Sequence, residues 1–268
     1  MIEIAVSVIC YDNENEVLEF ANKLSRQKGS EKIMLLVTCN KCKNIEQLRE
    51  DLSKVKISSQ VFETKKNLGY LLGCLYGFKS YGGEYKWSVI SNTDIDFVSD
   101  EFFAELLDKH YDSQIGCIGP DITLKVTGKH QNPFATSRPT NALMKMRKVV
   151  YSHYGLYSLY GCLSALKNKI VNHEKQITNK YIYGVHGSIV ILKKECVDKF
   201  IDDDIQIFMY GEELYIAEKL RESQLLSYYD TNLKIIHNEN QVTGKIASRK
   251  KQEWSSQSIN FLVDRYWK

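Results

Sequence analysis

The chain has 268 residues, a mass of 31.0 kDa and a formal net charge of +3, which suits one large domain or two small ones. Hydrophobic residues make up 43%, charged residues 26% and aromatic residues 11%, which excludes a disordered, collagen-like or polytopic membrane protein. The seven cysteines are an odd number, and the N-terminus lacks a basic stretch followed by an apolar one. We therefore expect reduced cysteines and a cytoplasmic location.

The first hundred residues alternate between short apolar runs and segments with helical spacing. The pattern predicts strands over 3–10, 32–38, 61–63 and 87–91, and helices over 14–27, 45–52 and 67–81. Strands that alternate with helices form a parallel sheet with helices on both faces. Ligands bind such sheets beyond the carboxyl ends of the strands, so we expect the functional side chains in the loops there.

The middle of the chain looks irregular, because all three prolines, Pro120, Pro133 and Pro139, fall within twenty residues and have glycines beside them. Further on, the sequence predicts a strand over 184–192, a helix over 212–222 and a last short strand over 233–236. We find no internal repeat, low-complexity tract or linker in the sequence, which favours a single domain with a helical extension at its C-terminal end.

Positive charge is concentrated in two late segments. Residues 141–180 contain seven lysines or arginines and one acid, residues 245–268 contain six and two, and the rest of the chain is net negative. The first segment also has tyrosines at every third position from Tyr151 to Tyr160. Basic and aromatic residues together suit an anionic membrane surface, and the same pattern fits a helical hairpin that packs on the core or on a second copy in a homodimer. The segment lacks the roughly 20 apolar residues that span a bilayer.

Several short motifs carry side chains of the types that bind a metal ion or transfer a proton. Asp94 and Asp96 follow a predicted apolar strand, and carboxylates supply the hard oxygen ligands that Mg²⁺ or Mn²⁺ prefers. Glu212 and Glu213 begin a predicted helix, whose N-terminus stabilises the ionised carboxylate that a general base requires. His237 ends the last predicted strand. Each of these residues also has an ordinary structural interpretation, as a turn, cap or loop residue.

Taken in their order along the chain, these motifs resemble those of family 2 glycosyltransferases, which have the GT-A fold. The resemblance runs from about Ile2 to about Gly244. It rests on the segments Val8–Asp12, Asn67–Gly69, Asn92–Asp94, Gly119–Asp121, Gln131–Pro133 with Arg138–Pro139, Val185–Ser188 and Phe208–Glu213, and on His237. It implies a Rossmann-like α/β fold with a mostly parallel sheet, helices on both faces, a basic helical insert and a helical C-terminal extension.

The resemblance also implies a division of the chain. A glycosyltransferase domain would occupy residues 1–244, with a nucleotide-binding half over about 1–100 and an acceptor-side half over about 101–244. The helical insert would cover about 141–180, and the C-terminal extension would cover 245–268.

Roles for individual residues follow from the same resemblance. Asp94 would coordinate a divalent cation, Mn²⁺ or Mg²⁺, that holds the diphosphate of the donor, with Asp96 or His237 as a further ligand. Glu213 would be the base that deprotonates the acceptor, and Glu212 is the alternative. The residues expected to bind substrate are Tyr11, Asp12, Asn40, Asn67, Gly69, Asn92, His186 and Gly187, and the first six of these would lie near the nucleotide sugar.

The implied function is inverting transfer of a hexosyl-type sugar from a UDP-, dTDP- or GDP-sugar to a hydroxyl of a glycan or a lipid-linked glycan. The resemblance suggests bacterial surface polysaccharide, such as capsule or O-antigen, made at the inner face of the plasma membrane. One departure from the family is that its members usually carry an Asp beside the position of Asn40, where this chain has Thr38 and Cys39.

Two other functions stay open at this point. The departure at Thr38 and Cys39 is compatible with a catalytically silent subunit that binds a sugar nucleotide or a glycan. A nucleotidyltransferase would use a similar nucleotide-binding half, but the N-terminal region has no glycine-rich phosphate loop followed by a lysine. The basic stretches match no helix-turn-helix, zinc or RNA-recognition pattern, so we do not expect nucleic acid as a partner.

Overall fold

The computed structural model describes residues 1–170, 178–239 and 248–268. The boundary expected at 244–245 and the charged residues Glu174, Lys175 and Lys245 lie outside these ranges. The strands are β1 (Ile4–Tyr11), β2 (Ile33–Lys41), β3 (Ser58–Glu63), β4 (Trp87–Ser91), β5 (Ile95–Phe97), β6 (Ile115–Leu124), β7 (Lys180–Ile182), β8 (Ile189–Lys193) and β9 (Leu226–His237). The helices are α1 (Glu14–Ser25), α2 (Ile45–Ser53), α3 (Leu71–Tyr81), α4 (Phe102–Asp108), α5 (Asn141–Ser152), α6 (Tyr154–Ile170), α7 (Lys194–Asp198), α8 (Glu212–Glu222) and α9 (Ser248–Tyr266).

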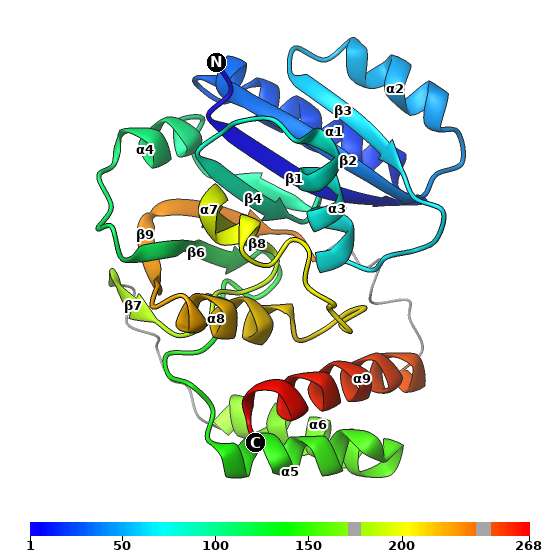
Figure 1. Cartoon of the computed structure of the whole chain (residues 1–268), viewed down its shortest axis with the longest axis vertical. Coiled ribbons are helices and arrows are strands. Elements are labelled where there is room, and N and C mark those ends of the chain that lie inside the picture. The colour runs from blue at the N-terminus through cyan, green and yellow to red at the C-terminus, as the bar shows by residue number, and fades with distance from the viewer. Residues whose placement is uncertain (171–177, 240–247) are drawn as a thin grey trace.

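The strands form one sheet in the order β3-β2-β1-β4-β8-β6-β9-β5, with β7 beside β9 (Figure 1). Most of its paired residues lie in parallel ladders, which join β3 to β2, β2 to β1, β1 to β4 and β6 to β9. Strand β8 runs antiparallel between β4 and β6. The predicted fold class, an α/β protein with a mostly parallel central sheet, is confirmed.

Apolar side chains on the two faces of the sheet form two separate cores. Alternate residues of β1 and β2 pack against α1, α2 and α4, with Phe20, Leu48 and Phe102 buried there. The other core lies among α3, α7, α8 and α9 and includes Tyr215 and Trp267, both fully buried. The helices on both faces thus hold the sheet rigidly, and the loops at its carboxyl edge start from fixed positions.

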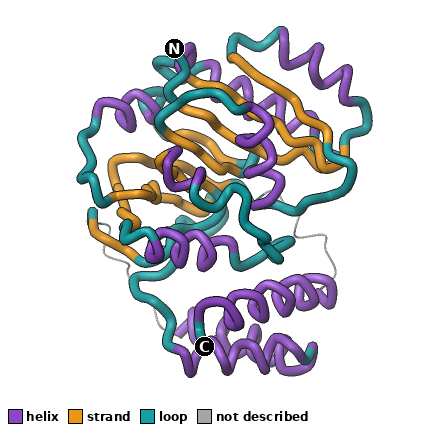
Figure 2. The backbone as a smooth tube through the Cα atoms, viewed as in Figure 1, coloured by secondary structure: helices purple, strands orange, loops and turns teal. Residues whose placement is uncertain are grey.

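Helices α5, α6 and α9 form a layer at one end of the molecule, beyond α8 (Figures 1 and 2). The expected helical insert and helical C-terminal extension are therefore present, and α5 packs against α9. Arg138 ties this layer to α8, because its guanidinium pairs with the buried carboxylate of Glu218 at 2.7 Å and donates to the backbone oxygen of Tyr266 at 2.7 Å. None of the described helices is long and apolar enough to cross a membrane.

The centre of the chain is more regular than its prolines and glycines predict. Residues 115–124 form the buried strand β6, in which Pro120 sits where the ladder to β9 shifts its register. Gly116 and Gly119 serve close packing there, since a Cβ at either position would lie within 3 Å of Leu220 or Val185. The prediction that this segment has no regular structure was wrong, because turn-forming residues can also occupy a crowded strand.

Three further assignments differ from the structure. The helix predicted from 67 begins only at Leu71, because Gly69 has a φ of +79° and lies in a loop. The last strand starts at Leu226 rather than 233. The prediction that all cysteines are reduced is wrong for Cys39 and Cys42, which form a disulfide. Their Cys-x-x-Cys spacing was the signal for this pairing in the sequence.

Candidate active site

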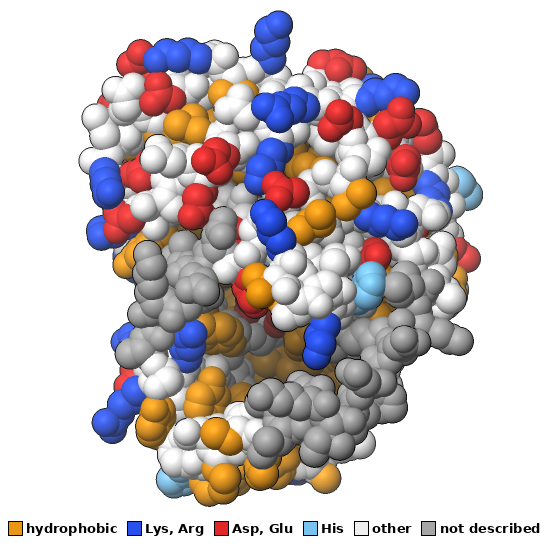
Figure 3. Space-filling view, turned by 180° about the vertical axis from the view of Figure 1, so that it is seen from behind, with side chains coloured by type: hydrophobic (Ala, Val, Ile, Leu, Met, Phe, Trp, Pro, Cys, Tyr) orange, Lys and Arg blue, Asp and Glu red, His pale blue; other side chains and the backbone are white. Residues whose placement is uncertain are grey.

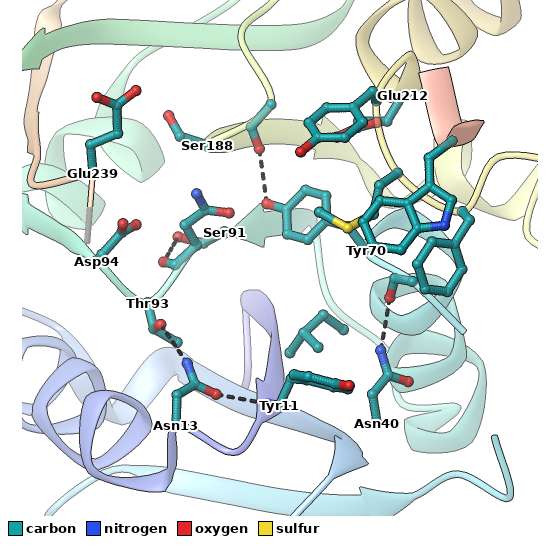
Figure 4. Close-up of a pocket in the computed structure, with 18 of the residues that line it drawn as sticks. Tyr11, Asn13, Asn40, Tyr70, Ser91, Thr93, Asp94, Ser188, Glu212 and Glu239 are labelled. Carbon is teal, nitrogen blue, oxygen red and sulfur yellow. Dashed lines mark hydrogen bonds between the residues drawn. The ribbon is translucent and has the colours of Figure 1, made fainter. Parts of the chain in front are cut away.

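A cavity of about 780 Å³ opens where the carboxyl ends of β1, β2 and β4 meet the loops before β8 and α8 (Figure 4). Most of the predicted site residues line it. They are Tyr11, Asn40, Asn67, Gly69, Asn92, Asp94, His186, Gly187, Glu212, Glu213 and His237. This size is typical of small-molecule sites. Residues from distant parts of the chain therefore meet in one cavity at the edge of the sheet where ligands are expected.

Asp94 and His237 lie together at one side of the cavity. Oδ1 of Asp94 is buried, has no hydrogen-bond partner among the described residues, and lies 3.3 Å from Nε2 of His237. The Oε1 atom of Gln131 is 2.8 Å from Nδ1 of His237, so a proton on Nδ1 donates to Gln131 and leaves the lone pair of Nε2 for a ligand. The Nδ2 atom of Asn92 lies 3.5 Å from that Nε2, at the limit of a hydrogen bond. A carboxylate oxygen and an imidazole nitrogen are ligands that suit a divalent cation.

Two of the acids predicted for the site, Asp96 and Asp12, lie outside the cavity lining. Asp96 forms an ion pair with Lys23, with Nζ and Oδ1 2.6 Å apart, and accepts a hydrogen bond from Asn238 at 2.8 Å. Asp12 pairs with Lys41 at the rim of the sheet. A lysine thus neutralises each of these carboxylates, and neither belongs to the site proposed below.

The loop 67–70 is held in place by Asn40. The Nδ2 atom of Asn40 donates to the backbone oxygen of Gly69 at 2.9 Å, and its Oδ1 accepts from the N–H of Leu68 at 3.0 Å. Asn67 accepts a hydrogen bond from the N–H of Gly69 within the loop. Because both ends of the Asn40 amide are engaged, its side chain shapes this wall of the cavity.

Gly69 also links this loop to the segment that precedes α8. The N–H of Tyr70 donates to the backbone oxygen of Phe208 at 3.1 Å, and a Cβ at position 69 would lie 2.0 Å from that oxygen. The positive φ of Gly69 adds a second reason for glycine here. Only glycine therefore lets the two loops approach this closely.

Replacement of Gly69 by Ala should displace one of these two loops. We expect Gly69→Ala to lower ligand affinity at the cavity at least about tenfold and to destabilise the fold by several kcal/mol, as strained backbone and overpacking do together. Gly161→Ala is the matched control, because a Cβ there meets no atom within 4 Å. If Gly69→Ala melted at the same temperature as the wild type and bound ligand equally well, the contact with Phe208 would contribute neither to stability nor to binding.

Glu212 and Glu213 begin α8 at the opposite side of the cavity from Asp94. Burial raises the pKa of both carboxyls, and the charge of Glu213 raises that of Glu212 further. Backbone N–H groups of Gly187 and Gly211 hydrogen-bond to Glu213 and favour its ionised form. Backbone N–H groups of Glu212 and Tyr210 favour the ionised form of Glu212 as well. Its Oε2 atom, however, is buried without a hydrogen-bond partner in the described parts of the chain.

The raised pKa of Glu212 has a consequence for stability. The native state binds this proton more tightly than the unfolded chain, so the group's stabilisation is complete below about pH 4.3 and is lost as the pH rises through the raised pKa. We expect Glu212→Gln to melt about 2–4 °C above wild type near pH 8 and level with it near pH 4. Glu84→Gln, at an exposed position, should show no such trend. A pH-independent difference between Glu212→Gln and wild type would contradict the raised pKa.

No family model matches the sequence, and no curated protein matches it. Solved structures do match. The mannosyltransferase PcManGT from Pyrobaculum calidifontis, in complex with GDP-Man and Mn²⁺, has a TM-score of 0.54 at 10% identity. GalNAc-T7, with UDP, GalNAc and Mn²⁺, has a TM-score of 0.66 at 11% identity. S. aureus TarS 1-349, in complex with UDP-GlcNAc, has a TM-score of 0.54 at 14% identity.

The chain therefore has the GT-A fold of glycosyltransferases. The alignments cover 90%, 100% and 92% of this chain, respectively, and 58%, 49% and 62% of those structures. The chain thus spans about half to three fifths of these larger proteins. At this identity the likeness shows the fold, and membership of family 2 stays a prediction.

Several residues that line the cavity of this GT-A chain were missed in the sequence. Asn13 donates to Thr93 at 3.3 Å and to Glu16 at 3.2 Å, and these three side chains join the start of α1 to the end of β4. Thr93 lies inside a motif that the sequence does show, whereas Asn13 and Glu16 resemble ordinary helix-start residues.

The C-terminal helix also contributes to the cavity. Lys251 and Trp254 of α9 line it, and the ring of Trp254 lies 4.9 Å from that of Phe208. Lys251 is the one lysine or arginine among the described lining residues, which include five carboxylates. No motif marks these two positions, because only the packing of α9 across the mouth of the cavity brings them there.

Proposed function

We propose that this protein is an inverting, divalent-metal-dependent glycosyltransferase that moves a hexosyl-type sugar from a nucleotide diphosphate sugar to a hydroxyl of an acceptor glycan. The observation that carries the proposal is that one cavity is lined both by the Asp94 and His237 pair and by the Glu212 and Glu213 pair. The first pair has the ligands for a cation, and the second supplies a base. The GT-A fold supports the same assignment.

The charge of Glu213 raises the pKa of Glu212, so the two carboxyls do not both ionise readily near neutral pH. Glu213 is the better candidate for the ionised partner, because the backbone N–H groups of Gly187 and Gly211 stabilise its charge. Glu212, which has an unpartnered buried oxygen, then retains the proton. Glu213 is therefore the base in our proposal.

The reaction is a single displacement at the anomeric carbon. The acceptor oxygen forms a bond to that carbon while the bond from the carbon to the diphosphate oxygen breaks, and the electron pair leaves with the diphosphate. The acceptor proton passes to Glu213, and the anomeric configuration is inverted. When bound, a cation such as Mn²⁺ or Mg²⁺ would supply positive charge to the leaving diphosphate. Asp94 and His237 would hold it there.

In our proposal the donor binds at the side of the cavity formed by β1, β2 and β4. Tyr11 is 41% exposed and offers an aromatic ring to a nucleobase, while Asn40 and Asn67 shape the wall beside it. His186 and Gly187 lie nearer to Glu213, on the acceptor side.

A thermal-shift panel tests this proposal directly. Purified protein is melted with UDP-, dTDP- and GDP-sugars, each with and without Mn²⁺, because a ligand that binds only the native state raises its melting temperature. We expect one nucleotide class to stabilise the protein only when Mn²⁺ is present, and release of that nucleoside diphosphate when an acceptor is added. Metal-dependent binding without any transfer would instead favour the catalytically silent subunit. Binding of nucleoside triphosphates in preference to the sugars would favour the nucleotidyltransferase.

The acceptor side is proposed to face an anionic membrane. Large apolar side chains on α5 and α6 are exposed, and hydrophobic atoms gather at this end of the molecule (Figure 3). These residues are Met146, Val149, Tyr154, Leu156, Leu159 and Leu163. Lys145 and Arg147 lie on helix α5, where Lys148 pairs with Asp264. Exposed apolar residues beside cations suit an anionic lipid surface, where lipid-linked glycans such as those of bacterial capsule or O-antigen are assembled.

Flotation with anionic vesicles checks this surface. Leu159 and Leu163 are 56% and 57% exposed, so replacing both by Asp removes apolar area and adds negative charge without disturbing a core. We expect at least about tenfold weaker binding at low salt, from the lost apolar area and the added repulsion. If the double variant floated as well as the wild type, or if the wild type did not float, membrane binding by this surface would be contradicted. Either outcome would favour a homodimer contact.

A further inference from the structure

Three of the seven cysteines meet at the carboxyl ends of β1 and β2. Cys10 and Cys39 are partners in the parallel ladder, so their side chains leave the same face of the sheet. Cys42 follows Cys39 by three residues, and one sulfur from each of the three lies within 4.8 Å of the others. The register of two strands and one short loop therefore gathers three sulfur atoms at one point.

This cluster lies on the face of the sheet away from the candidate active site. Cys10 and Cys39 belong to the core beneath α1 and α2, whereas the neighbouring Ile9 and Asn40 point to the opposite face, toward Gly73 of α3. Cys10 is 0% and Cys39 is 2% exposed, and Cys42 is half-buried. A ligand bound here would contact neither Asp94 nor His237.

Charged side chains of both signs lie near the cluster, because Asp12 pairs with Lys41. Burial raises the pKa of the Cys10 thiol to about 12, and the charges of Glu14, Asp12 and Glu16 add to the increase. A divalent cation offsets two of the three thiolate charges that its binding creates, so the burial that opposes a free thiolate opposes the metal-bound sulfurs less. No other group of three His, Cys, Asp or Glu side chains comes together in this way within residues 1–170, 178–239 and 248–268.

We propose that Cys10, Cys39 and Cys42 of the reduced chain bind a thiophilic divalent cation of the Zn²⁺ class, with water as the fourth ligand. Zn²⁺ binds thiolates at about 2.3 Å in a tetrahedral arrangement, which sets the sulfur atoms about 3.8 Å apart. The cluster already holds all three within reach of that spacing. This proposal does not depend on the glycosyltransferase function.

The site requires reduction of the disulfide between Cys39 and Cys42. A dithiol reductant transfers two electrons to this disulfide and becomes a disulfide itself, while each cysteine sulfur gains a proton. Cation binding then forms three metal–sulfur bonds and releases the three thiol protons to solvent. The segment thus has two closed forms, one joined by the disulfide and one joined by the cation.

Either form would fix the segment that contains Asn40. This residue lies between the two cysteines and supports the loop 67–69 through its hydrogen bonds to Gly69 and Leu68. A cation at the cluster would therefore stabilise one wall of the cavity from the opposite face of the sheet, without contacting a ligand in the cavity.

Titration with Co²⁺ tests the site, because Co²⁺ accepts the ligands of Zn²⁺ and absorbs in the near ultraviolet when thiolates bind it. We expect reduced wild-type protein to bind one Co²⁺ per chain with this absorption, and Zn²⁺ to displace it. Cys10→Ser and Cys42→Ser should lose the absorption. Cys162→Ser, which changes an exposed cysteine on α6, and Asp94→Asn should keep it.

Oxidised wild-type protein is a control that does not depend on the folding of a variant. Its Cys39–Cys42 disulfide leaves only one thiol at the cluster. We expect it to show no thiolate absorption with Co²⁺. Equal absorption in the oxidised protein or in Cys10→Ser, or no absorption in the reduced wild type, would overturn the proposal.

Discussion

Replacing Glu213 by Gln is expected to reduce sugar transfer by about 10²- to 10⁴-fold, the usual contribution of a positioned general base. Gln keeps the size of the side chain and removes its ability to take the acceptor proton. Donor binding should be nearly unchanged, because Glu213 lies beside Gly187, which our proposal places on the acceptor side. Initial rates and the donor-induced thermal shift, measured on the same preparations, check both parts.

Glu212→Gln is the matched control for this result. If Glu212 keeps its proton in the native protein, its replacement should slow transfer far less than replacement of Glu213. The opposite order, with Glu212→Gln inactive and Glu213→Gln active, would assign the base to Glu212. Loss of donor binding in Glu213→Gln with turnover retained would contradict the role of the pair altogether.

Asp94→Asn is expected to abolish the Mn²⁺-dependent part of donor binding. The amide removes the negative charge that faces Nε2 of His237 at 3.3 Å, and a neutral oxygen is a poor ligand for a hard cation. Because outer residues around metal ligands already contribute about 10–100-fold to affinity, loss of a direct ligand should weaken metal-dependent binding by at least that factor. The donor-induced thermal shift, recorded across a range of Mn²⁺ concentrations, measures this.

Asp96→Asn provides the comparison, since sequence reasoning offered Asp96 as a ligand and the structure pairs it with Lys23 outside the cavity. It should keep the Mn²⁺ dependence of wild type. His237→Gln should behave like Asp94→Asn. If Asp96→Asn and Asp94→Asn lost metal dependence equally, the cation would have to lie between them, and the pairing of Asp94 with His237 would not describe the site.

The N-terminal half of the fold follows from local patterns. Apolar runs in β1, β2 and β4 and helical spacing in α1 and α2 repeat with the periods of strand and helix, and each element ends at polar turn residues. Parallel order follows, because strands joined by helices pair in parallel. Most of the site could be predicted as well, since Asp94, Glu213 and His237 lie where predicted elements begin or end.

Elsewhere, local patterns were misleading because neighbours distant in sequence determine the conformation. Gly119 and Pro120 look like turn residues, yet both lie in β6, because this segment pairs with β9, and Val185 leaves no room for a Cβ at position 119. Asp94 and Asp96 are equivalent in the sequence. Pairing of β5 with β9 directs Asp96 to Lys23, while Asp94 stays with His237.

By itself, then, the sequence determined the α/β class, the order of the first elements and the candidate acids of the site, because periodicity and strand ends are local properties. Only the tertiary structure decided which of those acids share a cavity, that Lys251 and Trp254 join them, and that Cys10, Cys39 and Cys42 meet. The physical reason is that strand register and the packing of α9 depend on contacts between residues far apart in the chain, and no local pattern encodes these contacts.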